Sequence, residues 1–115
     1  MAWASWLAFP RSAAAVPILW FYEVGNGLLM ANRRKRITLD KIDGFLTRLK
    51  ALPIDSAEQV PSRILELPAL AQQYGLTNYD AAYLALAMRL NLPLATTDAD
   101  LRSAAAAAGV GIVAV

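Results

Sequence analysis

The sequence predicts an α/β fold, a three-layer sandwich with helices on both faces of a parallel sheet, for three reasons. Short apolar runs of strand length alternate with longer segments of helical character along the chain. Pro and Gly residues stand where these segments meet. A chain of 115 residues is long enough for one core and too short for two. We therefore expect a single domain over residues 1–115.

Each element has a local signal. Pro17 suits the first turn of a helix, Thr38 or Asp40 suits the cap of the next one, and Gly75 and Gly109 suit helix ends. Pro68 is expected to kink or divide the helical stretch around it. In chain order we expect a strand at 13–16, helices at 18–34 and 38–52, a strand at 52–55, a helical stretch at 61–75, a helix at 78–90, a strand at 93–96, a helix at 98–108 and a strand at 110–115.

The composition excludes several kinds of chemistry. The chain has no Cys and no His, so disulfides, thiolate zinc sites, Cys nucleophiles and imidazole bases are all excluded. The hydrophobic content of 57% favours a surface that meets a partner or a second copy of the chain. A net charge of +2 is compatible with a polyanion but does not require one.

The chain start, "MAWASWLAFPRSAAA", is not typical of a signal peptide. It has no Lys or Arg before its apolar run, and Pro10 and Arg11 interrupt that run. No apolar run approaches the length that crosses a bilayer. We therefore expect a cytoplasmic protein that does not enter a membrane.

Four acidic residues are predicted to meet at one edge of the sheet. A helix that follows a parallel strand starts at the carboxyl edge, and so does a helix that precedes one. Glu23 follows the first strand, and Asp80 begins a helix that precedes another strand. Asp98 and Asp100 leave that strand at the same edge. Binding sites of open α/β sheets lie at this edge.

Structural roles compete with a functional site. Thr77 and Asp80 have the spacing of a capping box, and Asp98 has the position of a helix cap. Glu23 is harder to explain in this way, because it lies among large apolar residues without a basic residue three or four positions away. Asn26 lies one turn further on and could orient it. Gly25 in the same helix indicates a close approach by another backbone.

A divalent cation would account for all of these acids together. Carboxylates gathered at one edge raise each other's pKa unless a cation lies among them. Such an ion would activate a water molecule and polarise a phosphoryl oxygen. Oxygen ligands suit Mg²⁺ or Mn²⁺ rather than zinc or copper. The basic run "RRKR" (33–36) either contacts a nucleic-acid backbone or is a solvated helix end that complements the helix dipole.

Two stretches resemble the PIN domain, and specifically the VapC-type toxin ribonucleases of type II toxin–antitoxin pairs. They are "VPILWFYEVGNGLLMANRRKRIT" and "LTNYDAAYLALAMRLNLPLATTDADL", which contain P-x-L-W-x-x-E-V-x-N, Y-D-A-x-Y-L-A-L-A and A-T-x-D-x-x-L in this order. The resemblance covers residues 13–115. It implies a PIN-like sandwich and an endoribonuclease that uses Mg²⁺ or Mn²⁺. It also implies a homodimer that a small antitoxin protein inhibits.

The resemblance also implies roles for individual residues. Glu23, Asp80 and Asp98 match the acids that bind the metal in the family, while Asp100 occupies a variable position. Thr96 and Asn26 match the accompanying polar residues.

The family's first strand, which ends in an aspartate, has no counterpart before Glu23, so the chain resembles an N-terminally truncated member. Residues 1–15 resemble the end of the family's second helix and the approach to its second strand. The missing strand lies centrally in the family's sheet, so its loss would leave unpaired edges or force a rearranged or intermolecular sheet. The alternative function is therefore an inactive remnant that acts as a dimerisation or antitoxin-binding module.

Overall fold

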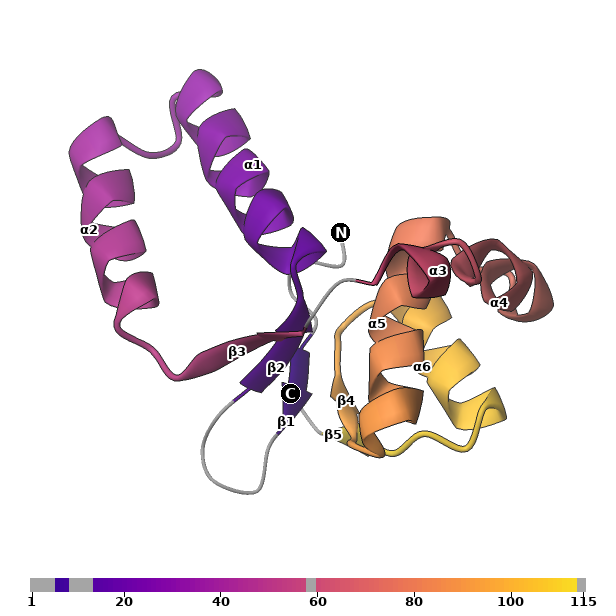
Figure 1. Cartoon of the computed structure of the whole chain (residues 1–115). Helices are drawn as coiled ribbons and strands as arrows, with labels where there is room; N and C mark the ends of the chain where they lie inside the picture. The colour runs from indigo at the N-terminus through magenta and orange to yellow at the C-terminus, as the bar shows by residue number, and fades with distance from the viewer. Residues whose placement is uncertain (1–5, 9–13, 58–59, 114–115) are drawn as a thin grey trace.

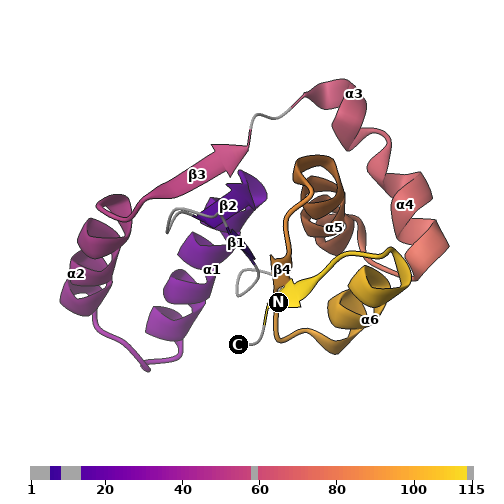
Figure 2. The same cartoon turned by 90° about the horizontal axis from the view of Figure 1, so that it is seen from below.

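A computed structural model describes residues 6–8, 14–57 and 60–113 of the chain, which form three layers (Figures 1 and 2). A sheet lies between the helices α1 and α2 on one side and the helices α3 to α6 on the other. The predicted sandwich is therefore confirmed. The elements are β1 (Trp6–Ala8), β2 (Ala14–Pro17), α1 (Leu19–Arg33), α2 (Leu39–Lys50), β3 (Ile54–Ala57), α3 (Pro61–Ile64), α4 (Leu67–Tyr74), α5 (Asn78–Leu90), β4 (Leu94–Ala95), α6 (Ala99–Ala107) and β5 (Ile112–Val113).

Four strands of the sheet run in the same direction. The strand order is β3-β2-β1-β4-β5, with β2 parallel to β3 and β4 parallel to β5. The central strand β1 is antiparallel to both of its neighbours. Because β2 and β4 each oppose β1, they point the same way, and so do β3 and β5. The predicted parallel arrangement is confirmed for these four strands.

The position of residues 6–8 corrects the prediction for the chain start. The resemblance implied the end of a helix and the approach to a strand for residues 1–15, but Trp6–Ala8 is itself a strand, with Leu7 opposite both Ala15 and Leu94. Residues 1–5 and 9–13 lie outside the described residues, and Ala14 and Ala15 belong to β2, as the strand expected at 13–16 predicted. Without a strand between β2 and β4, both would expose unpaired N–H and C=O groups at the centre of the fold. The chain start satisfies these groups by a rearranged sheet.

The helix boundaries follow their local signals closely. Helix α5 starts after Thr77, as predicted, and Gly75 ends α4 with a positive φ of 66°. The helical stretch 61–75 is divided, as predicted, but the break falls at residues 65–66. Pro68 then lies in the first turn of α4, where a backbone N–H would have no acceptor within the helix, so its absence costs no hydrogen bond. The strand expected at 52–55 is found at Ile54–Ala57.

The core surrounds α5. Tyr83, Leu84 and Leu101 are fully buried and pack with Val16 of β2 and Leu94 of β4. The small residues of the "DAAYLALA" stretch let α5 lie close to the strands, and it contacts both β2 and β4. This packing fixes the start of α5 relative to the end of β4.

Helices α1 and α2 form an arm, residues 19–50, that extends away from the sheet (Figure 1). Helix α2 contains no buried residue, and Leu39 at its start is 65% exposed. A Cβ on Gly25 of α1 would meet nothing within 4 Å, so the predicted close approach of another backbone is wrong at this position. Among the described residues, every helix is too short or too polar to cross a bilayer.

The central position of β1 predicts a specific effect of Leu7→Pro. A residue of a central strand directs its N–H towards one neighbour or the other, and Pro removes this donor. We expect Leu7→Pro to lower the free energy of unfolding by about 1–3 kcal/mol more than Leu7→Ala, which keeps the donor. Urea denaturation of both variants measures the difference. Equal stabilities would contradict the central position of β1.

Candidate active site

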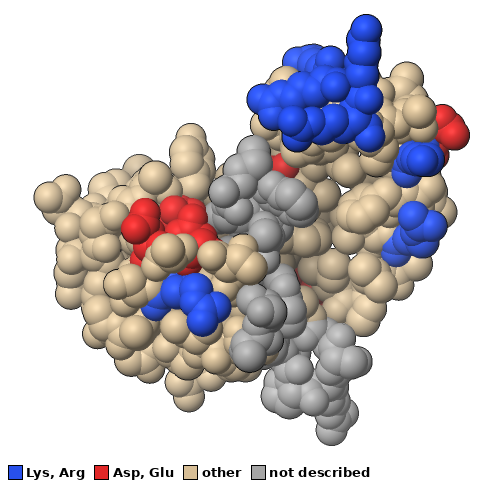
Figure 3. Space-filling model, turned by 180° about the vertical axis from the view of Figure 1, so that it is seen from behind, with Lys and Arg blue, Asp and Glu red and all other residues tan. Residues whose placement is uncertain are grey.

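Three aspartates lie at the starts of α5 and α6, next to the carboxyl end of β4. Asp80 is in the first turn of α5, Asp98 is the N-cap residue of α6, and Asp100 is in the first turn of α6. Both helices start at this edge because α5 leads into β4 and α6 leads away from it. Figure 3 shows acidic side chains gathered on the side of the molecule that α3 to α6 form. We call Asp80, Asp98 and Asp100 the acidic edge.

The pKa of Asp80 shows that these carboxylates interact. Burial raises the pKa of Asp80 above its ordinary value, and the negative charges of Asp98 and Asp100 raise it further. The native state therefore holds a proton on Asp80 more tightly than the unfolded chain does. Ionisation of Asp80 costs folding free energy as the pH rises through this range. A cation at the acidic edge would reverse that cost.

The capping roles are also present, and they leave carboxylate oxygens available. Thr77 Oγ1 accepts a hydrogen bond from the Asp80 N–H at 3.1 Å, so the cap uses the backbone of Asp80. Asp98 Oδ1 accepts from the Leu101 N–H at 2.9 Å, while no hydrogen bond is found at Oδ2 of this described residue. The structural and functional interpretations of these aspartates are therefore compatible.

Glu23 is held by Tyr83, a residue that the sequence did not single out. The Tyr83 hydroxyl donates a hydrogen bond of 2.7 Å to Glu23 Oε1, which joins α1 to α5 across 60 residues of sequence. Burial raises the pKa of Tyr83, and so do the Glu23 hydrogen bond and the charges of Glu23 and Asp80. The phenol therefore stays protonated and remains a donor. The negative charges of Glu23 and Asp80 both act on the Tyr83 hydroxyl, so Tyr83 links Glu23 electrostatically with the acidic edge.

The two supporting polar residues differ in position. Asn26 is exposed and has no hydrogen bond to Glu23, so the orienting role considered for it belongs to Tyr83. Thr96 is 1% exposed, and its Oγ1 accepts a hydrogen bond from the Asp98 N–H at 3.1 Å. Arg102, a residue without a sequence signal, donates from Nη1 to the Thr96 carbonyl at 3.1 Å. Thr96 and Arg102 thus shape the turn that presents Asp98.

The donors fit a hard divalent cation by their chemistry. Within the described ranges, no group of three or more acidic residues is close enough together to hold a metal ion. Mg²⁺ needs only one or two carboxylates, since it keeps several waters and takes further oxygens from substrate phosphates. Asp80 and Asp98 meet that requirement, whereas the observed partner of Glu23 is the Tyr83 hydroxyl. Metal binding by Glu23, Asp80, Asp98 and Asp100 stays a prediction.

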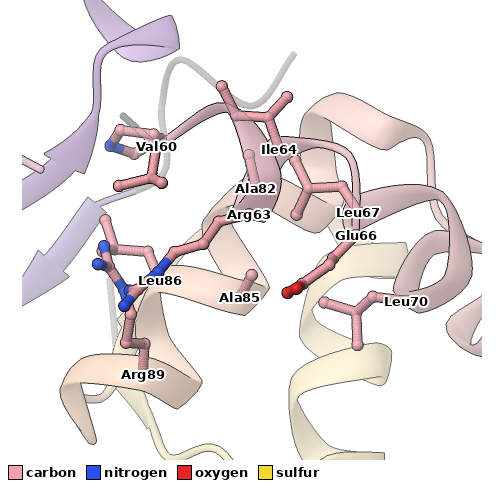
Figure 4. A pocket seen from close by; sticks show the side chains of 11 residues that line it. Val60, Arg63, Ile64, Glu66, Leu67, Leu70, Ala82, Ala85, Leu86 and Arg89 are labelled. Atoms are coloured by element: carbon pink, nitrogen blue, oxygen red, sulfur yellow. The ribbon is translucent and has the colours of Figure 1, made fainter. Parts of the chain in front are cut away.

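A cavity of about 550 Å³ lies away from these acids (Figure 4). It is lined mainly by apolar side chains of α3, α4 and α5, among them Ile64, Leu67 and Leu86. Arg63 and Arg89 also line it. None of the four predicted acids contributes to this cavity. It is therefore a separate feature on another face of α5.

The Tyr83–Glu23 hydrogen bond predicts the outcome of Tyr83→Phe. The variant leaves a half-buried carboxylate without its donor, so we expect a loss of about 1–3 kcal/mol in the free energy of unfolding at neutral pH. Tyr79→Phe is the matched control, because the Tyr79 ring is 64% exposed. A loss of equal size in Tyr79→Phe would contradict a specific stabilising bond between Tyr83 and Glu23.

Known proteins are similar to this chain in fold and in sequence. The PIN domain family model matches residues 1–107. The chain is 38% identical over 84 residues to Ribonuclease VapC3 from Pyrobaculum aerophilum, which covers 70% of this chain and 62% of that protein. The crystal structure of PAE2754 from Pyrobaculum aerophilum matches with a TM-score of 0.66 and 31% identity, over 78% of this chain and 65% of that chain.

The matched region thus spans less than two thirds of either relative. Ribonuclease VapC3 supports the predicted resemblance to VapC-type proteins. Since the family model extends over nearly the whole chain, this protein belongs to the PIN-domain family.

Proposed function

We propose that the protein is a VapC-type endoribonuclease that hydrolyses RNA phosphodiester bonds in the cytoplasm with Mg²⁺ or Mn²⁺. The similarity to Ribonuclease VapC3 supports this reaction. The observation that carries the proposal is the gathering of Asp80, Asp98 and Asp100 at the starts of α5 and α6, the edge where α/β proteins bind ligands. Burial raises the pKa of Asp80, and repulsion from the Asp98 and Asp100 charges adds to this rise. Repulsion of this kind is what a divalent cation relieves.

The residues have distinct roles in this proposal. Asp80 and Asp98 would hold the ion, with Asp100 beside them and Glu23 held on α1 by Tyr83. The bound ion supplies a water of lowered pKa and polarises the phosphoryl oxygen. Tyr83 would restrict the position of Glu23 through its hydroxyl hydrogen bond. Thr96 is buried, so it acts by positioning Asp98 rather than by touching RNA.

Replacement of Asp98 by Asn tests the reaction. Asn is as good an N-cap residue as Asp, so α6 should form normally and thermal unfolding should change little. We expect cleavage of a single-stranded RNA in Mn²⁺ to fall by at least about 100-fold, since loss of even an indirect ligand contact costs 10–100-fold. Asp43→Asn in α2 removes the same charge from an exposed site and should cleave normally. Cleavage that persists in a chelator would contradict the metal mechanism.

The same experiment separates the enzyme from an inactive remnant. A remnant would not cleave RNA when Mg²⁺ or Mn²⁺ is added. It would still capture a VapC-type antitoxin. The family relation supports an antitoxin partner for either alternative. Exposed aromatic residues next to Glu23 also favour such a partner, since Tyr22 is 75% exposed and Phe21 is 39% exposed.

We also propose that the chain forms a homodimer through the face that contains the cavity. Leu65 beside the cavity is 79% exposed, and Ile64 is 40% exposed. An apolar surface of this kind is stabilised when a second copy covers it. The proposed dimer leaves the acidic edge free, because the acids do not line this face.

The dimer predicts a difference between two Leu variants. Leu65→Asp places a charge in the proposed interface, so we expect the variant to sediment as a monomer at concentrations where the wild type is a dimer. Leu39→Asp introduces the same charge at a residue of the arm that is 65% exposed, and it should remain dimeric. Analytical ultracentrifugation measures both. A monomeric wild type, or a dimeric Leu65→Asp variant, would contradict this interface.

A further inference from the structure

We propose that the end of the α1–α2 arm is a binding surface for the phosphate backbone of single-stranded RNA. Four consecutive basic residues, Arg33, Arg34, Lys35 and Arg36, form this surface, which we call the basic tip. All four are exposed. The choice of RNA as the polyanion rests on the proposed ribonuclease function. The surface itself rests on the observations that follow.

The basic tip has an ordered backbone that does not need its charged side chains. The N–H groups of Arg34, Lys35 and Arg36 donate to carbonyl groups in the last turns of α1 at 2.9 to 3.0 Å. Lys35 adopts a left-handed conformation, with φ 60°, and the Asn32 side chain donates to the Ile37 carbonyl at 2.9 Å. Backbone N–H groups therefore satisfy the last carbonyls of the helix, and the Asn32 side chain holds the turn that follows it. Capping does not explain why four cations stand here.

The cations of the basic tip are also free of internal partners. In the part of the chain that the structure describes, none of the four makes a hydrogen bond through its side chain or an ion pair. Four like charges held on one tight turn repel each other. An anionic partner would relieve that repulsion, and a partner with regularly spaced phosphates would engage several of them together.

Charge is divided between the two sides of the molecule. The arm, residues 19–50, holds seven of the eleven Lys and Arg and three of the nine Asp and Glu, a net charge of +4. The remaining residues carry a net charge of −2. Figure 3 shows the basic side chains at the end of the arm and the acidic side chains on the other side, both on one face of the molecule. A single strand crossing this face would meet both.

The distance between Glu23 and the basic tip suits one RNA strand. Arg33 lies ten residues after Glu23 in α1, which places the basic tip about 15 Å from Glu23 at a rise of 1.5 Å per residue. A stacked strand advances about 3.4 Å per nucleotide, so roughly four or five nucleotides would bridge that distance. The basic tip would therefore hold phosphates several nucleotides away from Glu23.

A binding experiment in chelator tests the basic tip without any cleavage. The probe is a fluorescently labelled single-stranded RNA of mixed sequence, and its anisotropy is measured over a series of salt concentrations. Each phosphate contact on a single strand contributes about 0.7 to the slope of log K against log salt. We expect the double variant Arg34→Gln/Arg36→Gln to bind more weakly and to lower this slope by about 1.4.

The matched control is Arg48→Gln/Lys50→Gln. It removes the same charge from exposed positions at the opposite end of α2. We expect it to keep the wild-type slope. Equal losses in the two double variants would show that net charge, rather than the basic tip, governs binding, and would overturn the inference. Wild-type binding to vesicles that contain phosphatidylserine but not to RNA would overturn it as well.

Failure of the ribonuclease function is distinguishable from failure of this inference. If the wild type binds RNA through the basic tip but cuts none in Mn²⁺, the surface stands and the catalytic proposal fails. If the wild type cuts RNA and the tip variant has an unchanged salt slope, only the surface fails. When both hold, the tip variant should raise KM and leave kcat unchanged, because the contact is remote from the reacting phosphate.

Discussion

The common direction of β2 and β4 is the constraint on which the rest of the structure depends. Helix α1 leaves β2, α5 leads into β4, and α6 leaves β4, so all three helices start at one edge only if these strands are parallel. The antiparallel strand β1 lies between β2 and β4 and pairs with both. It therefore holds them in the same direction. If either strand were reversed, Glu23 and Asp80 would lie at opposite ends of the sandwich.

The hydrogen bond between Tyr83 and Glu23 links this edge to the core. A fully buried phenol needs a partner for its hydroxyl, and an acid among apolar residues needs a donor. Each group meets the requirement of the other across the two helical layers. Packing of α5 against the sheet consequently fixes the position of a carboxylate on α1. Stability and site geometry are thus coupled through one contact.

The molecule separates its charges over the length of α1. Near the start of this helix lies Glu23, which Tyr83 holds, and at its end lies the basic tip. A rigid helix keeps the two apart, so the cations do not neutralise the carboxylates. A nucleic-acid strand is long enough to reach both, whereas a small anion is not. The arm is therefore more than a spacer between β2 and β3.

The sequence alone determined the alternation of elements, most of their boundaries, and the edge at which Asp80, Asp98 and Asp100 lie. These follow from local signals, such as the Thr77 cap and the Gly75 turn, together with the polarity of parallel strands. Only the tertiary structure decided that residues 6–8 enter the sheet, since strand pairing depends on which backbone groups lack partners elsewhere. It also decided that Tyr83 holds Glu23, because contacts between distant segments leave no spacing signal in the chain.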